Sequence, residues 1–467
     1  MLFNSIHFLL FLPVVATVYL LLPLKARRIF LLAASFYFYC VWSVKWSFLM
    51  VYTIAQDYWA IRIIHRSRRP AVRKTALVLS LGGNLLILVL FKYYGFFNNS
   101  LGALWGSPPL PALDLILPMG ISFYTFQTMS YVVDVYRREI APPRSLLDFA
   151  LFITFFPQLV AGPIMRGSEL LHQFYEEHRP RAERILSGVL LVVWGLLKKV
   201  FVADSMGRIV DSVYGPAAAP LDPGAFSGPA LLMATYAFAV QIYCDFSAYT
   251  DICIGSGRIL GFRIIENFNA PYLAVSITEF WRRWHMSLSR WLRDYLYIPL
   301  GGNRLGNART YLNLMITMLL GGLWHGASWT FVAWGGLHGL YLAVERLLGL
   351  DRLTPSRLTY GRRWLMGIFT FHLVCLSWVL FRSPTLAYAA QVVWRILTLA
   401  GGNPVNPIPL ACVIAIVALQ TAKLKINFHM AFMRRPALAR WTVYACIGAL
   451  LIALTTTRSQ QFIYFQF

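Results

Sequence analysis

The chain has 467 residues, of which 58% are hydrophobic and only 13% are charged. Soluble globular domains carry about 25% charged residues, so this composition excludes an ordinary soluble enzyme and predicts an all-α polytopic membrane protein. The 42 Lys and Arg against 19 Asp and Glu give a formal charge of +23. The basic residues cluster in short loops between apolar segments, as expected of cytoplasmic loops facing anionic lipid, so we expect contact with membrane lipids and no nucleic-acid partner.

The first half of the chain predicts a series of membrane spans. They lie at about 6–23, 29–43, 46–64, 75–96 and 113–135. The N-terminal segment has no basic region and no cleavage site, so it is typical of a retained span rather than a signal peptide. Arg and Lys without any acid fill the end of the third span, between 62 and 74, which predicts a cytoplasmic loop there and a periplasmic N-terminus.

Two segments of this half are unusual for membrane helices. The span at 113–135 is rich in Ser, Thr and Gln, so we expect it to be buried among other helices, where hydroxyl and amide groups find partners. Residues 147–165 contain Pro157, Gly162 and Pro163. A broken backbone at membrane depth is tolerated only inside protein or beside a cavity, so this pattern predicts a re-entrant or kinked segment.

The second half predicts further spans and one interfacial segment. The spans lie at about 185–203, 229–253, 364–381, 406–422 and 441–456, and an amphipathic segment at 387–399 is ambiguous between a span and an interfacial helix. With the central stretch described next, we expect roughly ten to twelve spans in one integrated membrane domain over residues 1–467. No internal repeat supports an inverted-repeat transporter.

The stretch at 277–340 contains the strongest chemical signal. Its second half is apolar enough to span a bilayer, yet it contains His325 near its middle, in GGLWHGASW. Ionisable residues at membrane depth are costly and tend to line functional cavities. Burial favours a neutral imidazole that can accept a proton, and the flanking glycines permit a close approach of ligand or backbone. The alternative is a histidine that only forms a hydrogen bond between helices.

The first half of the same stretch, WRRWHMSLSRWLRDYLYIPLGGNR, is crowded with Arg and Trp. On a continuous helix Arg282, His285 and Ser289 would share one face. Two interpretations stay open: an interfacial amphipathic helix with snorkelling arginines, or a site for an anionic carrier whose phosphates are bound by guanidinium groups. The candidate donor-binding residues are Arg282, Arg283, Arg290, Arg293 and Arg304.

Several other chemistries have no support in the sequence. There is no GxSxG nucleophile motif, HExxH zinc motif or Walker A loop, and no histidine is followed five residues later by Asp. The six cysteines all fall in apolar segments without a CxxC pair, which indicates packed thiols rather than a disulfide or metal site. We therefore expect no metal and no tightly bound cofactor.

Two long motifs, FWRRWHMSLSRWLRDYLYIPLGGN and LLGGLWHGASWTFVAWGGLHG, resemble the signature of the membrane-bound O-acyltransferase superfamily. The resemblance is closer to the bacterial alginate O-acetyltransferase branch, with the teichoic-acid D-alanyl transfer protein as a more distant relative. It extends to LPMGISFYTFQTMSYVVDVYR, FFPQLVAGPIMR and YCDFSAYTDICIGSGRILGFRIIENFNAPY. It thus covers a core at about 1–345, and the C-terminal transmembrane helices at 346–467 are only generically similar.

The resemblance implies a bundle of transmembrane helices, with re-entrant and interfacial helices, around a central cavity. It implies that His325 is the catalytic histidine. His285 matches the second polar position, which is His in this branch and often Asn in eukaryotic relatives. His338 is also usual in this branch, although its helical spacing from His325, roughly 220° of rotation, would turn it to a different face.

We therefore expect acyl transfer with His325 as general base and His285 orienting the acceptor or stabilising the oxyanion. Supporting structural residues are Asp245, Asp251, Glu279, Asn303 and Trp324. The resemblance implies acetyl-CoA or another acyl thioester as co-substrate, and an exported polysaccharide such as alginate as acceptor, reached through a periplasmic esterase-like partner at the inner membrane. The alternatives are a lipid- or protein-directed acyltransferase of the same superfamily, and a polytopic solute transporter.

Overall fold

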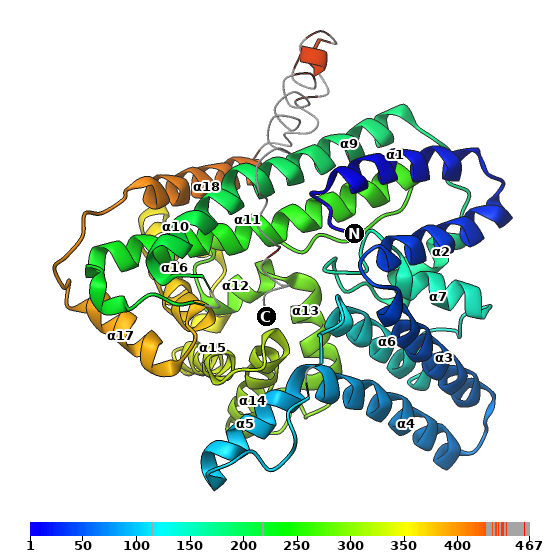
Figure 1. Cartoon of the computed structure of the whole chain (residues 1–467), viewed down its shortest axis with the longest axis horizontal. Helices are drawn as coiled ribbons and strands as arrows, with labels where there is room; N and C mark the ends of the chain where they lie inside the picture. The colour runs from blue at the N-terminus through cyan, green and yellow to red at the C-terminus, as the bar shows by residue number, and fades with distance from the viewer. Residues whose placement is uncertain are drawn as a thin grey trace. The chain divides into compact units, whose positions relative to one another are not determined.

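The computed structural model describes residues 1–425 except 114, 217 and 218, together with 432, 435, 436, 438, 440–442, 445 and 462. Within these residues every regular element is a helix, as predicted (Figure 1). Almost all of the span predicted at 441–456 lies outside the described residues, as do His429 and Cys446. In the described chain four helices are long and apolar enough to cross a membrane: Pro70–Trp105, Ala182–Tyr214, Gly228–Leu260 and Tyr360–Arg382.

The chain divides into two compact units. The first comprises Met1–Val193 and Tyr249–Ile265, and the second comprises Trp194–Ala248 and Glu266–Phe467. Of the three boundaries, Val193/Trp194 and Ala248/Tyr249 fall inside the helices α9 (Ala182–Leu197) and α11 (Gly228–Leu260), and Ile265/Glu266 falls in the loop after α11. The single integrated domain expected for residues 1–467 stays a prediction.

The first unit is a helical bundle that begins with short apolar helices. Its elements are α1 (Ile6–Leu21), α2 (Leu24–Cys40), α3 (Val44–Arg66), α4 (Pro70–Leu88), the π-helical turn η1 (Val89–Tyr93), α5 (Tyr94–Trp105), α6 (Ile121–Tyr136), α7 (Leu146–Thr154), α8 (Gly167–Leu170) and most of α9 (Ala182–Leu197). Helix α3 packs against α4, α6 and α7, and α2 packs against α7 (Figure 1).

Helix α6 is buried along almost its whole length, as its polar composition predicted. Gln127 donates from Nε2 to the carbonyl of Phe152 at 3.1 Å, so its amide finds a partner inside the unit. After α7 the chain runs through residues 155–165 without helix while remaining buried, which agrees with the predicted break. Gly120 has φ +74°, and a Cβ there would lie 2.9 Å from the carbonyl oxygen of Leu159, so this close contact requires glycine.

The second unit contains the predicted chemical residues. Its elements are the π-helical turn η3 (Lys198–Ala203), α10 (Asp204–Tyr214), most of α11 (Gly228–Leu260), α12 (Ile277–Arg283), α13 (Met286–Leu292), the π-helical turn η6 (Arg293–Tyr297), α14 (Asn307–His325), α15 (Trp329–Leu347), α16 (Tyr360–Arg382), α17 (Leu386–Leu397) and α18 (Ile408–Lys425). Helix α15 packs against α12, α14 and α16 (Figure 1).

Helices α14 and α15 form a tight hairpin. Gly326 is extended and ends α14 directly after His325, and the Ser328 side chain accepts from the Thr330 amide to begin α15. The expectation of one continuous span with His325 near its middle is therefore wrong. His325 is the last residue of the first helix, because the Gly-Ala-Ser sequence that follows it reverses the chain.

The Arg- and Trp-rich segment is also not one helix. Helix α12 ends at Arg283 and α13 begins at Met286, and His285 between them has φ 42° and ψ 52°. The backbone at this break pairs with an earlier loop: the amide of Met286 donates to the carbonyl of Asn267 at 3.0 Å. The predicted helix face shared by Arg282, His285 and Ser289 is therefore wrong, because His285 lies in the break.

Candidate active site at His285 and His325

His325 is held at the end of α14 by aromatic rings. Only 4% of its surface is exposed. The centroids of Trp324, Trp334 and Phe381 lie 5.0, 5.1 and 5.4 Å from that of the imidazole, all near edge to face. These rings come from α14, α15 and α16. The imidazole is thus enclosed by apolar surface, which favours its neutral form.

The hairpin that carries His325 depends on close backbone contact. A Cβ on Gly322 would lie 2.2 Å from the Phe331 carbonyl oxygen, and a Cβ on Gly335 would lie 2.2 Å from that of Met318. Only glycine permits such an approach. The sequence motif GGLWHG therefore places His325 through the packing of α14 on α15, in addition to any contact with a ligand.

His285 is fully buried and its ring is oriented by Asn267. The side-chain oxygen of Asn267 accepts from the Ser287 amide at 2.9 Å, which fixes the orientation of the amide group. The same oxygen lies 3.4 Å from His285 Nδ1. This is a long hydrogen bond, and it requires the proton on Nδ1. The neutral ring then presents Nε2 as a hydrogen-bond acceptor.

The two imidazoles lie close together in a near edge-to-face arrangement. Their ring centroids are 6.4 Å apart and their planes meet at 65°. Trp324 lies next to both, with its ring 5.8 Å from His285 and 5.0 Å from His325. The structure therefore brings together the two histidines that were singled out from separate motifs, and places the predicted supporting residue Trp324 beside them.

His338 has a different environment. The indole Nε1 of Trp281 donates to its Nδ1 at 3.3 Å, and its Nε2 lies 3.0 Å from Ser377 Oγ. Since Ser377 donates its own proton to the Val374 carbonyl, His338 Nε2 is the donor of that pair. Both ring nitrogens are engaged, so His338 is a structural residue. The expected rotation away from His325 does not apply, because the two lie on different helices and both contact Trp334, at 5.1 and 4.8 Å.

The five candidate arginines have separate environments. Arg283 pairs with Glu279, with Nη2 2.6 Å from Oε1, and Arg293 pairs with Asp294 at 2.6 Å. Arg290 is half-buried, whereas Arg282 and Arg304 are exposed. Glu279 therefore serves Arg283 and also accepts from the Val275 amide at 2.8 Å.

Three predicted supporting residues remain: Asp245, Asp251 and Asn303. Asp245 pairs with Lys199 at 2.8 Å. Asp251 lies on the part of α11 that belongs to the first unit. Asn303 is exposed in the turn before α14.

Comparison with known proteins places this arrangement in a family. The model of the membrane-bound O-acyltransferase family matches residues 136–382, which include both histidines and the aromatic rings around them. The chain belongs to this family. It is therefore an acyltransferase and a multi-pass membrane protein.

Individual relatives indicate, more closely than the family model does, which branch of the family this chain resembles. This acyltransferase is 44% identical over 401 residues to a probable alginate O-acetylase of Azotobacter vinelandii, covering 85% of this chain and 77% of the relative. It is 36% identical over 433 residues to a peptidoglycan O-acetyltransferase of Helicobacter pylori, covering 86% and 80%. A teichoic acid D-alanyltransferase of Bacillus subtilis is 27% identical over 316 residues, covering 64% and 75%.

Some residues that shape the candidate site were missed by sequence reasoning. Asn267 orients His285 from 18 positions away. Glu345, on α15, accepts from the amides of Ile277 and Thr278 and so binds the N-terminus of α12. Neither residue forms a motif with its partner, because the contacts depend on the tertiary fold. The only sequence signal for Glu345 was the presence of an acidic residue in the otherwise apolar α15.

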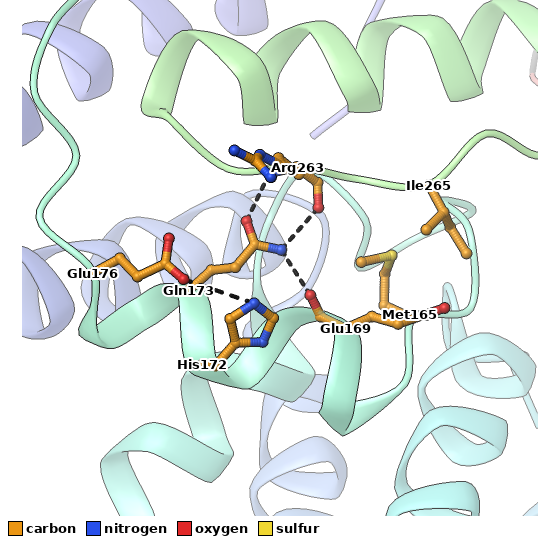
Figure 2. A pocket seen from close by; sticks show the side chains of 7 residues that line it. All are labelled: Met165, Glu169, His172, Gln173, Glu176, Arg263 and Ile265. Carbon is orange, nitrogen blue, oxygen red and sulfur yellow. Dashed lines mark hydrogen bonds and ion pairs between the residues drawn. The ribbon is translucent and has the colours of Figure 1, made fainter.

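A surface pocket of about 400 Å³ lies elsewhere in the acyltransferase, in its first unit (Figure 2). It is lined by Met165, Glu169, His172, Gln173, Glu176, Arg263 and Ile265. The Gln173 amide exchanges hydrogen bonds of 2.7 and 3.0 Å with the backbone of Arg263, which joins the two segments that form the pocket. All lining residues belong to the first unit, whereas His285 and His325 belong to the second.

Proposed function

We propose that this O-acyltransferase transfers acetyl groups from a thioester donor towards hydroxyl groups of an exported, alginate-like polysaccharide, with His325 as general base. The observation that carries the proposal is the proximity of His325 and His285, whose ring centroids are 6.4 Å apart, with Trp324 in contact with both. The names of the relatives, which are O-acetylases of alginate and peptidoglycan, support the acetyl group and the polysaccharide acceptor.

In the proposed reaction, His325 takes the proton from the acceptor hydroxyl as its oxygen attacks the thioester carbonyl. The new C–O bond forms, the C–S bond breaks, and the proton passes to the departing thiolate. General base catalysis of this kind contributes about 10²–10⁴-fold in rate. The buried, neutral setting of His325 suits this role, because an imidazolium could not accept the proton.

We propose that His285 orients the acceptor. With its proton on Nδ1 towards Asn267, its Nε2 accepts a hydrogen bond and does not donate one. This tautomer supports orientation of an acceptor hydroxyl in preference to stabilisation of an oxyanion, which requires a donor. Fixing the hydroxyl between two rings reduces the entropy lost on reaching the transition state.

The ion pairs of Arg283 and Arg293 reduce the set of arginines that we propose as donor-binding residues. Three of the five candidate arginines are exposed: Arg293, which pairs with Asp294, and the two residues Arg282 and Arg304. Guanidinium groups bind phosphate well. We propose that Arg282 and Arg304 contact the phosphates of acetyl-CoA or of another acyl thioester. Arg283 and Arg293 already have carboxylate partners, so they contribute less to donor binding.

The proposed topology places the N-terminus in the periplasm and the protein in the inner membrane. It rests on the basic loop at 66–74, which the positive-inside rule assigns to the cytoplasm. A cytoplasmic thioester and an exported acceptor lie on opposite sides of the membrane. We propose that a periplasmic esterase-like partner completes the transfer.

The central experiment compares purified His325→Ala with His65→Ala, a substitution of an exposed histidine at the end of α3. Both are reconstituted and supplied with radiolabelled acetyl thioester. His325→Ala should insert and purify normally but lose acetyl transfer, and His65→Ala should retain it. Retained transfer in His325→Ala would refute the catalytic assignment.

The acceptor is identified by mass spectrometry of glycan, lipid and protein fractions from cells that lack the gene. Loss of O-acetyl groups from the glycan alone supports the proposal. Loss from lipid or protein would instead establish a lipid- or protein-directed acyltransferase. Flux of an intact solute into proteoliposomes, without acetyl transfer, would favour a transporter.

A further inference from the structure

Lys198 and Lys199, two successive residues of the π-helical turn η3, contact the α11 residues Ser247 and Asp245, which follow and precede Phe246 in the sequence. Lys199 Nζ lies 2.8 Å from Asp245 Oδ1 and 2.8 Å from Asp204 Oδ1. Lys198 Nζ donates to Ser247 Oγ at 2.8 Å. The side chains of Lys199, Asp204 and Asp245 are almost completely buried, and removing one partner of such a group leaves an uncompensated charge. Lys199, Asp204 and Asp245 thus form a buried ion-pair cluster between η3, α10 and α11, next to the contact of Lys198 with Ser247.

The residue between these two contacts on α11 is Phe246. Successive residues of an α-helix point in directions about 100° apart around its axis. Asp245 and Ser247 therefore each point about 100° away from Phe246, on opposite sides of it. Asp245 and Ser247 are therefore about 160° apart around the helix, so the lysines contact α11 on both flanks of Phe246. Its ring lies edge to face on His285, with centroids 4.7 Å apart and planes at 83°, and 5.0 Å from Phe268.

We infer that Lys198 and Lys199 are positioning residues that fix the rotation of α11 and so hold Phe246 against His285. The inference rests on the proposed role of His285 as the residue that orients the acceptor. A rotation of α11 about its axis would break both lysine contacts and move the Phe246 ring across the imidazole. π-Helical turns occur often at functional sites, and here the turn brings two consecutive side chains to one helix.

Two sets of variants test the inference. Lys198→Met removes the hydrogen bond to the uncharged Ser247. The double variant Lys199→Met/Asp245→Asn removes the bridge by deleting one positive and one negative charge together, which limits the risk of misfolding. The matched control is Lys92→Met, since Lys92 also lies in a π-helical turn, η1, and donates to a serine, Ser122 Oγ at 3.5 Å.

The kinetic readout separates positioning from general damage. We expect Lys198→Met to lower kcat about 10- to 100-fold, the scale of a small misplacement of reacting groups, with KM for the acetyl thioester unchanged and the control within about twofold. In a Phe246→Leu background the effect of Lys198→Met should largely disappear, because both changes act through the same ring. Independent, multiplying effects would overturn the inference.

A second readout does not depend on activity. With 4-fluorophenylalanine incorporated at position 246, the ¹⁹F resonance should move in Lys198→Met and in the double variant, and stay in place in Lys92→Met. An unmoved resonance in both lysine variants would overturn the inference even if they were slow. Activity retained in His325→Ala would refute the proposed function while leaving this spectroscopic result intact, so the two failures are distinguishable.

Discussion

The side-chain oxygen of Asn267 joins the Ser287 amide, at 2.9 Å, to the Nδ1 of His285, at 3.4 Å. One atom therefore stabilises the chain break between α12 and α13 and sets the tautomer of the ring. Asn267→Ala should lose both effects. We expect kcat for acetyl transfer to fall about 10- to 100-fold, because the ring is no longer oriented, and stability to fall by about 1–3 kcal/mol, because a buried amide loses its acceptor.

Asn267→Asp provides the matching rescue. It keeps an oxygen at the same place, so thermal stability measured in detergent and kcat should both recover relative to Asn267→Ala. If Asp and Ala were equally slow, the orienting role of this oxygen would be disproved.

His338 should behave as a structural histidine. Its substitution by Phe leaves the Trp281 N–H without an acceptor and Ser377 without a donor, which we expect to lower stability by about 1–3 kcal/mol. Folded His338→Phe should keep part of its acetyl transfer, in contrast to His325→Ala. Melting temperature and activity per folded molecule measure the two effects. Full stability with no activity would instead indicate direct participation in the reaction.

The hairpin of α14 and α15 offers a test with neighbouring glycines. Gly335→Ala should destabilise the protein by about 1–3 kcal/mol, because its Cβ would meet the Met318 carbonyl at 2.2 Å and force the helices apart. Gly336→Ala, one position along, meets only a Leu319 methyl at 3.4 Å. It should be neutral or slightly stabilising, since Ala favours helix. Equal thermal stability of the two variants would contradict this packing.

Arg282 and Arg283 are adjacent but should differ in function. Arg282→Ala removes an exposed guanidinium, and we expect KM for the acetyl thioester to rise several-fold with little change in kcat. Arg283→Ala leaves the buried Glu279 carboxylate without its 2.6 Å partner, so the expected result is lower yield of folded protein. Steady-state kinetics and gel-filtration recovery distinguish them. A reversal of the two outcomes would overturn the donor assignment.

Acid stability should depend on His178, which lies in the loop before α9. Burial lowers the pKa of its imidazole below the ordinary 6.5, and its Nε2 donates to the Gln173 carbonyl at 2.8 Å. A lowered folded-state pKa means that the unfolded chain binds the proton first, so this contribution is present above pH 6.5 and is lost as the pH falls below it. His178→Gln should reduce the loss of melting temperature between about pH 6.5 and 5.

Much of the fold could be predicted because membrane-spanning segments are restricted to mostly apolar residues. Apolar runs located most helices, and the polar composition of α6 correctly indicated burial. The two errors, at His285 and His325, came from treating a periodic or apolar run as continuous. The left-handed residue at His285 is set by tertiary contacts with Asn267, which no local pattern encodes. The reversal at Gly326 follows from the short Gly-Ala-Ser sequence, which the apolar residues on both sides obscured.

The site itself was predicted in part. The two histidines and Trp324 were identified from their motifs, and they do meet. Asn267, Phe246 and Phe381 were not, because each comes from a distant segment and an ordinary residue type. The arginines were treated as one group because of their density, but short-range carboxylates at Glu279 and Asp294 already engage two of them.

The left-handed backbone at His285, with φ 42°, restricts what evolution can place there. Among residues other than glycine, Asn, Asp and His tolerate this conformation best, and β-branched or bulky side chains tolerate it poorly. The family resemblance implies that this position is His or Asn. The backbone conformation, and not only the chemistry of the side chain, then restricts which residues can occupy it. Libraries that vary position 285 should yield folded protein mainly for this small set, whatever their acyl-transfer rate.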